Sequence, residues 1–445
     1  MKSLASLSGK STEEPMHILY LAQFYNEPTD PGGGRHYAFT RALIGRGHQV
    51  TLVTGQENYR TGTISERYTG RLVHREEKEG VTLLRTWVLT GHRRRFALRY
   101  INQLSFLLTG LWAGARVKPK PDLIVASSPP LFVGIAGALL SKFHRSPLIT
   151  DIRDLWPESV VAMGLPVHPL MVKSGYKMAR WIYRSSRRMI AVTEGICSGL
   201  QKQGKRLDEI TLIPNGVDLG IYENIPDAAE AVRDQETAGK FVCIYVGGMG
   251  PVHNVGTLVE TAARLRDNPK IHFLLIGDGP EKNLLVQKSK EMGLNNVTFR
   301  PAVPKQEVPA TLASADLCIY SLRNDPFFRG TFPNKNFDYM ASGRPLVLAV
   351  EGESRRLVEE AGAGFVVTPE SADEMADAIL RMVSLPPEER EAMGRRGREH
   401  VLRHYHRRML SDRFVDLVES VGAGSRGGNR EASASGDRSA FSGRD

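Results

Sequence analysis

Short runs of apolar residues alternate with amphipathic stretches along most of this chain. The first run, His17–Phe24, is almost continuously hydrophobic, which is typical of a strand buried on both faces of a sheet. A turn-rich segment follows, and apolar residues then recur at helical spacing from about 35 to 46, where Gly47 ends the pattern. The next apolar run, His48–Thr54, predicts a second strand. Strand, helix and strand in this order predict parallel strands joined by a crossover helix.

The alternation continues through the first half of the chain and starts again after a polar segment. Further strands of the first half are predicted at 123–127, 147–152, 189–193 and 209–213. Its further helices are predicted near 96–116, 131–144, 168–187 and 195–203. After the charged stretch around 220–240, strands are predicted at 241–246, 271–277, 296–299, 316–320 and 345–350, and the last helix at about 387–419.

This pattern predicts an α/β protein with two Rossmann-like, doubly wound parallel-sheet domains. The predicted domains span residues 16–215 and 216–420, and the last helix is expected to cross back to the first domain. Residues 421–445 differ in composition, since 6 Gly, 5 Ser and 4 Ala make up 15 of the 25 positions. That composition predicts a disordered tail.

Composition and cysteine usage narrow the class of protein. Hydrophobic residues make up 41% and charged residues 24% of the chain, as in a globular protein. The three cysteines, Cys197, Cys243 and Cys318, lie far apart, which excludes a disulfide scaffold and a cysteine-rich zinc site. Neither a secretory signal nor a run of 18 apolar residues is present, so we expect no leader and no membrane span.

The net charge of +10 is concentrated in the first half of the chain. Residues 1–220 hold 30 Lys and Arg against 17 Asp and Glu, a net charge of +13. The segment His92–Lys120 contains seven Lys and Arg and no acidic residue, together with many large apolar side chains. Such a helix can lie on an anionic membrane, so residues 92–116 are the predicted contact. The alternative is an ordinary buried helix with basic ends. Nucleic acid is not expected as a partner, because no recognition module is present.

Three consecutive glycines, Gly32–Gly34, stand between the first predicted strand and the first helix. Ligands of open parallel sheets bind beyond the carboxyl ends of the strands. Glycines there let backbone N–H groups approach an anion in front of a helix N-terminus. The run therefore predicts a phosphate-facing or sugar-facing loop, and a flexible turn is the alternative.

A second candidate is the segment 331–345, which opens a helix and closes it at Gly343. Lys335 and Asp338 are three residues apart and share one face of this helix near its start. A lysine there can neutralise a diphosphate, and a carboxylate can accept hydrogen bonds from both ribose hydroxyls. A surface charge pair is the alternative.

A third candidate is the cluster of Asp151, Arg153, Asp154 and Glu158 at the end of the strand predicted at 147–152. Three carboxylates and an arginine at a strand end predict a functional site, and a surface salt-bridge network is the alternative. The chain contains no GxxxxGK[ST], HExxH or GxSxG motif, which argues against P-loop NTPases, zinc peptidases and α/β-hydrolases.

Five motifs in order resemble the family 4 glycosyltransferases of the GT-B fold. They are the glycine loop, IPNGVD (Ile213–Asp218), YVGG (Tyr245–Gly248), IGDGP (Ile276–Pro280) and FDYMASGRPLV (Phe337–Val347). The segments RDLWPES and PNKNFDYMASG look like those of bacterial O-antigen and capsule enzymes of the L-fucosamine transferase type. The resemblance implies two Rossmann-like domains facing across a cleft.

The resemblance also implies roles for individual residues. Asp338 stands where the family has the Glu that holds the ribose, and Gly330 stands where the family has the Glu that touches the donor sugar. Lys335 is the substitute expected for the family's phosphate-binding cations. The implied donor-binding residues are Gly33, Gly34, Gly248, Gly277, Gly279, Val303, Arg329, Lys335 and Asp338. The implied catalytic residues are Arg153, Asp154, Glu158 and Lys335.

The function implied by the resemblance is transfer of a sugar, expected to be an N-acetylated amino sugar, from a nucleotide-sugar to a lipid-diphosphate-linked or glycan acceptor. A UDP-sugar is favoured over a GDP-sugar. The family retains the anomeric configuration and needs no metal or other cofactor, and no Asp-x-Asp motif is present. The expected place is the bacterial cytoplasm, on the inner face of the inner membrane. A nucleotide-sugar 2-epimerase of the same fold and a non-catalytic sugar-nucleotide-binding scaffold are the alternatives.

Overall fold

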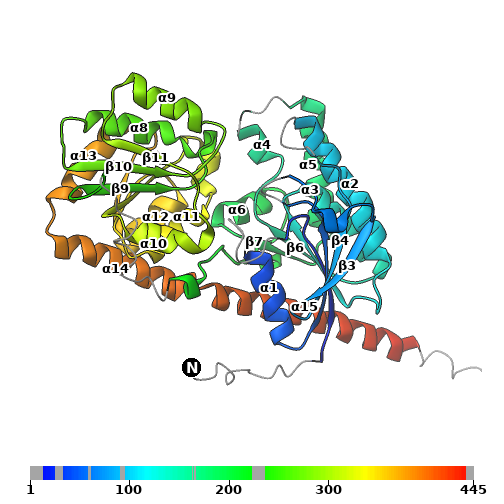
Figure 1. Ribbon diagram of the computed structural model, residues 1–445. Coiled ribbons are helices and arrows are strands. Elements are labelled where there is room, and N and C mark those ends of the chain that lie inside the picture. Colours follow the sequence, from blue (N-terminus) through cyan, green and yellow to red (C-terminus); the bar gives the residue numbers. More distant parts are fainter. Residues whose placement is uncertain are drawn as a thin grey trace, which may run out of the picture.

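The structure is a computed structural model that describes residues 14–25, 34–58, 62–90, 96–162, 164, 167–222 and 236–436. Two α/β lobes stand side by side, each built around its own sheet, and a long C-terminal helix runs beneath the first lobe (Figure 1). The predicted fold class is therefore confirmed.

The first sheet has eight strands in the order β3-β4-β2-β1-β5-β6-β7-β8. The strands are β1 His17–Leu21, β2 Gln49–Gly55, β3 Val73–Lys78, β4 Val81–Thr86, β5 Leu123–Ser128, β6 Leu148–Ile152, β7 Arg188–Ala191 and β8 Ile210–Leu212. All neighbours pair in parallel except β3, which is antiparallel to β4 at the edge. The sequence did not predict this hairpin, because β3 reads VHREEK, in which four consecutive charged residues on a half-exposed edge strand replace an apolar run.

Helices cover both faces of the first sheet. They are α1 Arg35–Gly45, α2 Phe96–Ala115, α3 Leu131–His144, α4 Glu158–Ala162, α5 Pro169–Ser185 and α6 Glu194–Lys202. Helices α2 and α3 pack on one face, where Phe106 and Val133 join its apolar core. Helix α1 packs on the other face through Phe39 and Leu43.

The second sheet has six parallel strands in the order β11-β10-β9-β12-β13-β14. The strands are β9 Phe241–Val246, β10 Ile271–Ile276, β11 Val297–Arg300, β12 Leu317–Ser321, β13 Leu346–Ala349 and β14 Gly364–Val367. This order reverses direction between β9 and β12, which is the position where open parallel sheets bind ligands. The carboxyl end of β9 is therefore the expected nucleotide side of this domain.

Helices of the second half surround this sheet and share one apolar core with it. They are α8 Val255–Arg264, α9 Lys282–Glu291, α10 Val308–Ala313, α11 Asn334–Ala341, α12 Glu353–Ala361, α13 Ala372–Ser384 and α14 Pro387–His404, and the last helix of the chain, α15 Arg407–Gly436, packs on the first domain instead. The helix expected at 387–419 is in fact two helices, α14 and α15, that meet at Tyr405–His406.

The chain crosses between the lobes twice, and the two crossings lie side by side. Val217 N–H donates to the carbonyl of Tyr405 at 3.0 Å, and Arg407 N–H donates to the carbonyl of Val217 at 3.0 Å. Helix α15 then packs on the first domain, where Phe414 stacks on Phe39 with ring centres 4.1 Å apart. The last helix thus covers a face of the first sheet (Figure 1).

Helix α15 also changes the expectation for the C-terminal tail. The boundary predicted at residue 421 falls inside this helix, because Val421 is buried and a Cβ at Gly422 would meet the Met16 sulfur at 2.2 Å. Packing against the first domain thus outweighs the low-complexity composition at these two positions. Within the described ranges, no helix has the length and apolar character needed to span a membrane.

Candidate functional site

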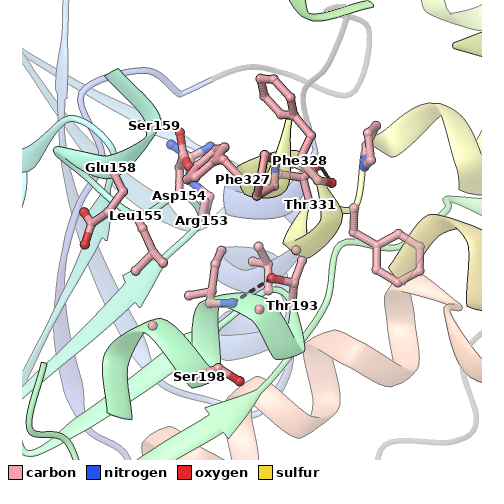
Figure 2. A pocket seen from close by; sticks show the side chains of 18 of the residues that line it. Arg153, Asp154, Leu155, Glu158, Ser159, Thr193, Ser198, Phe327, Phe328 and Thr331 are labelled. Carbon is pink, nitrogen blue, oxygen red and sulfur yellow. Dashed lines mark hydrogen bonds between the residues drawn. The ribbon is translucent and has the colours of Figure 1, made fainter. Parts of the chain in front are cut away.

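A cleft of about 640 Å³ lies between the two lobes. Its first wall carries Arg153, Asp154 and Glu158, which follow β6, and the facing wall carries Phe327 and Phe328 (Figure 2). Helix α6 of the first domain contributes a third side of the cleft. Residues from both halves of the chain therefore face one space.

Lys335 lies behind the end of strand β9, among aromatic side chains. Its Nζ donates to the Tyr245 hydroxyl at 2.7 Å and lies 4.6 Å and 5.4 Å from the ring centres of Tyr245 and Tyr320. Burial lowers the pKa of Lys335 to about 7. No carboxylate of the described chain is hydrogen-bonded to this amine. The alternative of a surface charge pair between Lys335 and Asp338 is thus excluded, and the site is suited to an anion.

The loops after β9 and β10 touch backbone to backbone next to Lys335. A Cβ at Gly277 would lie 1.8 Å from the carbonyl oxygen of Gly247, and one at Gly279 would lie 2.2 Å from that of Met249. These contacts explain the glycines at 277 and 279 by loop packing, whatever they do for a donor. Gly248 is more open, since the nearest atom to its Cβ position is 3.8 Å away.

Asp338 sits on α11 and is held by two other side chains. Lys305 Nζ donates to both of its carboxylate oxygens at 2.6 Å, and the Tyr222 hydroxyl donates to one of them at 2.8 Å. Lys305 follows β11, so the carboxylate joins three segments of the second domain. Its predicted ribose contact stays a prediction.

The remaining predicted donor residues lie in different surroundings. Gly33 is outside the described residues. Gly34 starts α1 with φ at 115°, and Arg407 fills the space that a Cβ at Gly34 would need. Val303 is half-buried and packs on the core of the second domain. Arg329 is exposed and lines a separate small pocket, so Lys335 rather than Arg329 is the cation behind the glycine loop.

The predicted acceptor-side residues gather on the wall of the first domain. Arg153 donates to the Pro129 carbonyl at 2.8 Å, and Glu158 accepts from the Gln203 amide at 2.7 Å. Burial raises the pKa of Asp154 to about 6 and also raises the pKa of Glu158. The two carboxyls are therefore no ordinary surface network, because they take up protons at a higher pH than exposed carboxyls do.

Asp151, in the same predicted cluster, does not line the cleft. It is fully buried and accepts from Arg35 Nη2 at 2.9 Å and from the Ser127 hydroxyl at 3.0 Å. Arg35 also donates to the carbonyls of Ile213 and Pro214. This pair therefore fixes the start of α1 to the end of β6 and to the crossing segment.

The domain interface explains the glycine at the family's first Glu position. A Cβ at Gly195 would lie 2.5 Å from the Cα of Gly330, so these two backbones meet across the interface. A Cβ at Gly330 itself would lie 3.1 Å from the Cα of Gly195, so a side chain at Gly330 would press on the first domain. Beside this contact, Glu353 of α12 accepts from the N–H groups of Glu194 and Gly195 at 3.1 and 2.6 Å.

Sequence reasoning missed several residues of the site. His253 lines the cleft, and burial together with the charge of Lys335 lowers its pKa to about 3, so its ring is neutral. Tyr245 opened the recognised YVGG motif, but nothing marked it as the partner of Lys335. Glu353 carried no signal, because its partners are backbone groups of the other domain. No group of three or more His, Cys, Asp or Glu among the described residues is arranged to hold a metal ion.

Two family models match the chain. One, described as a glycosyl transferase 4-like domain, matches residues 32–216, and the other, described as glycosyl transferases group 1, matches residues 240–384. Together they cover well over half of the chain. The chain belongs to glycosyltransferase family 4.

Relatives and solved structures agree with this glycosyltransferase assignment. The glycosyltransferase is 25% identical over 355 residues to WcaI of Escherichia coli K12, which is ascribed to colanic acid biosynthesis, and the match covers 77% of this chain and 86% of WcaI. Anabaena HepE in complex with UDP and glucose has a TM-score of 0.67 at 19% identity, covering 91% of this chain and all of HepE. Sucrose-phosphate synthase from Thermosynechococcus elongatus has a TM-score of 0.71 at 18% identity, covering 92% of this chain and all of that one. These structures confirm the GT-B fold.

Proposed function

We propose that this glycosyltransferase moves an N-acetylated amino sugar from UDP to a lipid-diphosphate-linked glycan in the synthesis of a surface polysaccharide. The observation that carries the proposal is the cleft itself, with the half-buried cation Lys335 beside one wall and the half-buried carboxyls Asp154 and Glu158 on the other. Relatives ascribed to colanic acid biosynthesis support the pathway class, and the UDP complexes of HepE support the nucleotide.

In this proposal the donor binds on the second domain, at the carboxyl end of β9. Asp338 holds the ribose hydroxyls, and the open backbone at Gly248 faces the diphosphate. Lys335 lies behind that backbone and balances the charge that develops on the departing UDP. Catalysis of this kind is mostly placement and charge stabilisation, so neither a metal nor another cofactor takes part. The configuration at the anomeric carbon is retained.

The acceptor binds on the first-domain wall. Asp154 and Glu158 accept hydrogen bonds from its hydroxyls. Arg153 lies on the same wall, where its positive charge stabilises negative charge on the reacting groups. Because the pKa of Asp154 is raised to about 6, this carboxyl is ionised above that pH and can orient an attacking hydroxyl. Activity should therefore rise through pH 6 and level off above it.

A membrane surface on the first domain delivers the lipid-linked acceptor in this proposal. Helix α2 exposes Ile101, Leu104, Leu108 and Trp112 at helical spacing, with Leu108 62% and Trp112 42% exposed. These side chains argue against an ordinary buried helix. The predicted arginines 93–95 lie outside the described residues, and the side chain of Phe96 is not described.

Basic residues accompany this apolar stripe. Helix α3 packs between α2 and α5 (Figure 1), and α5 exposes Lys173, Lys177, Arg180 and Arg184 along one side. An apolar stripe beside a basic one suits a bilayer interface that carries anionic lipids. The proposed location is the inner face of the bacterial inner membrane.

Flotation with vesicles of phosphatidylglycerol and phosphatidylcholine tests this surface. We expect binding that weakens with salt, and that falls about a hundredfold when Lys173, Lys177 and Arg180 become Gln, from about 1 kcal/mol for each charge. Leu108→Ser with Trp112→Ser should also release the protein. Leu380→Ser, at an exposed leucine of the second domain, is the matched control. Binding that ignores all these changes would exclude this surface.

The reaction is tested by UDP release from UDP-N-acetylated amino sugars, with and without a membrane extract that contains lipid-linked acceptors. Acceptor-dependent release and a labelled lipid product are expected. A 2-epimerase would instead invert the configuration at C2 of the sugar without any acceptor. A non-catalytic scaffold would bind UDP-sugars without releasing UDP. Either outcome would replace the proposal.

A further inference from the structure

A second cavity, of about 240 Å³, adjoins the cleft where the two crossing segments meet. Its polar lining comes from both domains: Arg35 and Arg153 from the first, Asn334 from the second, and Asn215 and Arg407 from the crossings. Arg153 and Asn215 also line the main cleft. No carboxylate belongs to the described residues that line this cavity, and one of its three guanidinium groups, that of Arg35, is paired with a carboxylate, Asp151, behind the lining.

Three helices begin at this cavity. Arg35 is the first residue of α1, Asn334 of α11 and Arg407 of α15, and all three line the cavity. Neither Gly34 nor Pro333, which precede α1 and α11, caps its helix with a side chain. The starts of α1 and α11 present N–H groups and a partial positive charge, whereas α15 adds only the partial charge, because its first N–H already donates to the Val217 carbonyl. Helix dipoles and guanidinium groups thus both favour an anionic ligand.

The arginines are fixed by the fold. Asp151 neutralises Arg35 from behind the cavity, and Arg153 donates to the Pro129 carbonyl. Arg407 donates to the Gly216 carbonyl at 2.8 Å, and its guanidinium fills the space next to Gly34. Burial lowers the pKa of Arg407, but from a reference value of 12.5, so the group stays charged at neutral pH.

We propose that this cavity binds a phosphate group of the sugar acceptor. The inference rests on the proposed function and names the residues that hold the acceptor's anionic end. Guanidinium pairs and helix N-termini together are suited to a tetrahedral phosphate oxyanion. The donor diphosphate has a different cation, because Lys335 points to Tyr245 while the preceding residue, Asn334, faces this cavity.

The test titrates protein that is already saturated with UDP, using inorganic pyrophosphate and geranyl diphosphate as probes in isothermal calorimetry. Both should bind together with UDP, and geranyl diphosphate should bind at least tenfold more tightly, as expected for a lipid-linked source. Arg407→Gln should weaken both probes at least tenfold, and Arg407→Lys should recover part of the loss. The matched control is Arg408→Gln, at the exposed neighbour on the same helix.

Three results would overturn the assignment. If UDP excludes pyrophosphate, the cavity belongs to the donor. If inorganic pyrophosphate binds as tightly as geranyl diphosphate, the site serves a free anion. If the affinity for acetate equals the affinity for pyrophosphate at equal ionic strength, the ligand is a carboxylate. Should Arg407→Gln fail to fold, Asn334→Asp adds a carboxylate to the lining at a helix N-terminus, where the fold tolerates it.

The UDP titration itself is read first, and it separates the two proposals. Without UDP binding the proposed function fails, whereas the response of pyrophosphate to Arg407→Gln or Asn334→Asp can still be scored. With UDP binding intact and no effect of either variant, only the phosphate assignment fails.

Discussion

Each domain holds a largely enclosed cation beside the strands of its sheet, Arg35 in the first domain and Lys335 in the second. The two cations have opposite surroundings. In the first domain Arg35 meets the buried carboxylate of Asp151 at 2.9 Å and three backbone or amide oxygens of the crossing segment. In the second domain Lys335 meets the Tyr245 hydroxyl and two aromatic faces, and burial alone accounts for its lowered pKa.

From this difference we expect Arg35 to be a structural charge and Lys335 a functional one. Asp151 already supplies the anion that Arg35 needs, so that pair joins elements of the fold whether or not a ligand is present. Lys335 is buried with neutral partners, which is unfavourable until an anion arrives. A buried charge without a carboxylate is therefore a better indicator of an anion site than a buried ion pair.

The largest expected effect is the loss of stability in Asp151→Asn. Removing the carboxylate leaves the guanidinium of Arg35 buried without its counter-charge, which lowers the free energy of unfolding by about 3–5 kcal/mol. Urea denaturation followed by circular dichroism measures it. Asp373→Asn, which breaks the exposed pair with Arg264, should change stability far less, because solvent screens that pair. Equal effects of the two variants would remove the distinction.

Lys335→Met should have the opposite effect to Asp151→Asn: the stability is kept or raised, and turnover is lost. Met fills the same space between Tyr245 and Tyr320 without a buried charge, and the departing diphosphate loses its charge partner. We expect kcat to fall on the order of 10²–10³-fold, the size of one lost charge-stabilising contact, and donor affinity to fall less. Steady-state kinetics with thermal unfolding of the same sample measure both. A variant that is unstable but fully active would show that Lys335 is structural.

Asp338→Asn should weaken UDP binding by roughly tenfold, the size of one or two lost charged hydrogen bonds. Asn keeps the shape of the side chain but accepts fewer hydrogen bonds from Lys305, Tyr222 and the ribose. Calorimetric titration with UDP measures the change, and Asp377→Asn, at an exposed carboxylate of α13, serves as the control. Unchanged affinity in a folded variant would withdraw Asp338 from the donor site.

The smallest expected effect is a proton taken up with the donor. Lys335, with a pKa of about 7, is mostly neutral at pH 8, and a bound diphosphate stabilises its protonated form and raises that pKa. UDP binding at pH 8 should therefore take up about one proton, and affinity should fall as pH rises above 7. Titrations in buffers of different ionisation enthalpy measure the uptake, which Lys335→Met should abolish.

The sequence was sufficient for the fold because strand and helix periodicities repeat so regularly. His17–Leu21 and Phe241–Val246 are continuous apolar runs, and each leads into a glycine segment and a helix. The β3–β4 hairpin was missed because β3 carries four consecutive charged residues and no apolar run. The break between α14 and α15 was missed because it is made by contacts with the crossing segment at Val217.

The sequence predicted which candidate residues lie together where neighbours in sequence are neighbours in space. Arg153, Asp154 and Glu158 share one strand end, so their spacing alone brought them together on one wall. The partners of Lys335 and Asp338 lie on other strands and loops. The spacing along α11 therefore identified these two residues but not the side chains that they contact. Arg407 is one of many arginines, and nothing in the local sequence marks its place beside Gly34.

The path of α15 has a consequence for how the protein is made. Phe414 and Val418 complete the apolar layer on one face of the first sheet, yet they are synthesised only after the entire second domain. During synthesis, that face of the first domain stays uncovered while more than 150 further residues emerge from the ribosome. A chain that stops at Tyr405 would keep every strand of both sheets and still leave Phe39 and Tyr20 open to water. Co-translational chaperone binding should therefore concentrate on nascent chains shorter than about residue 410, a window set by the order of synthesis.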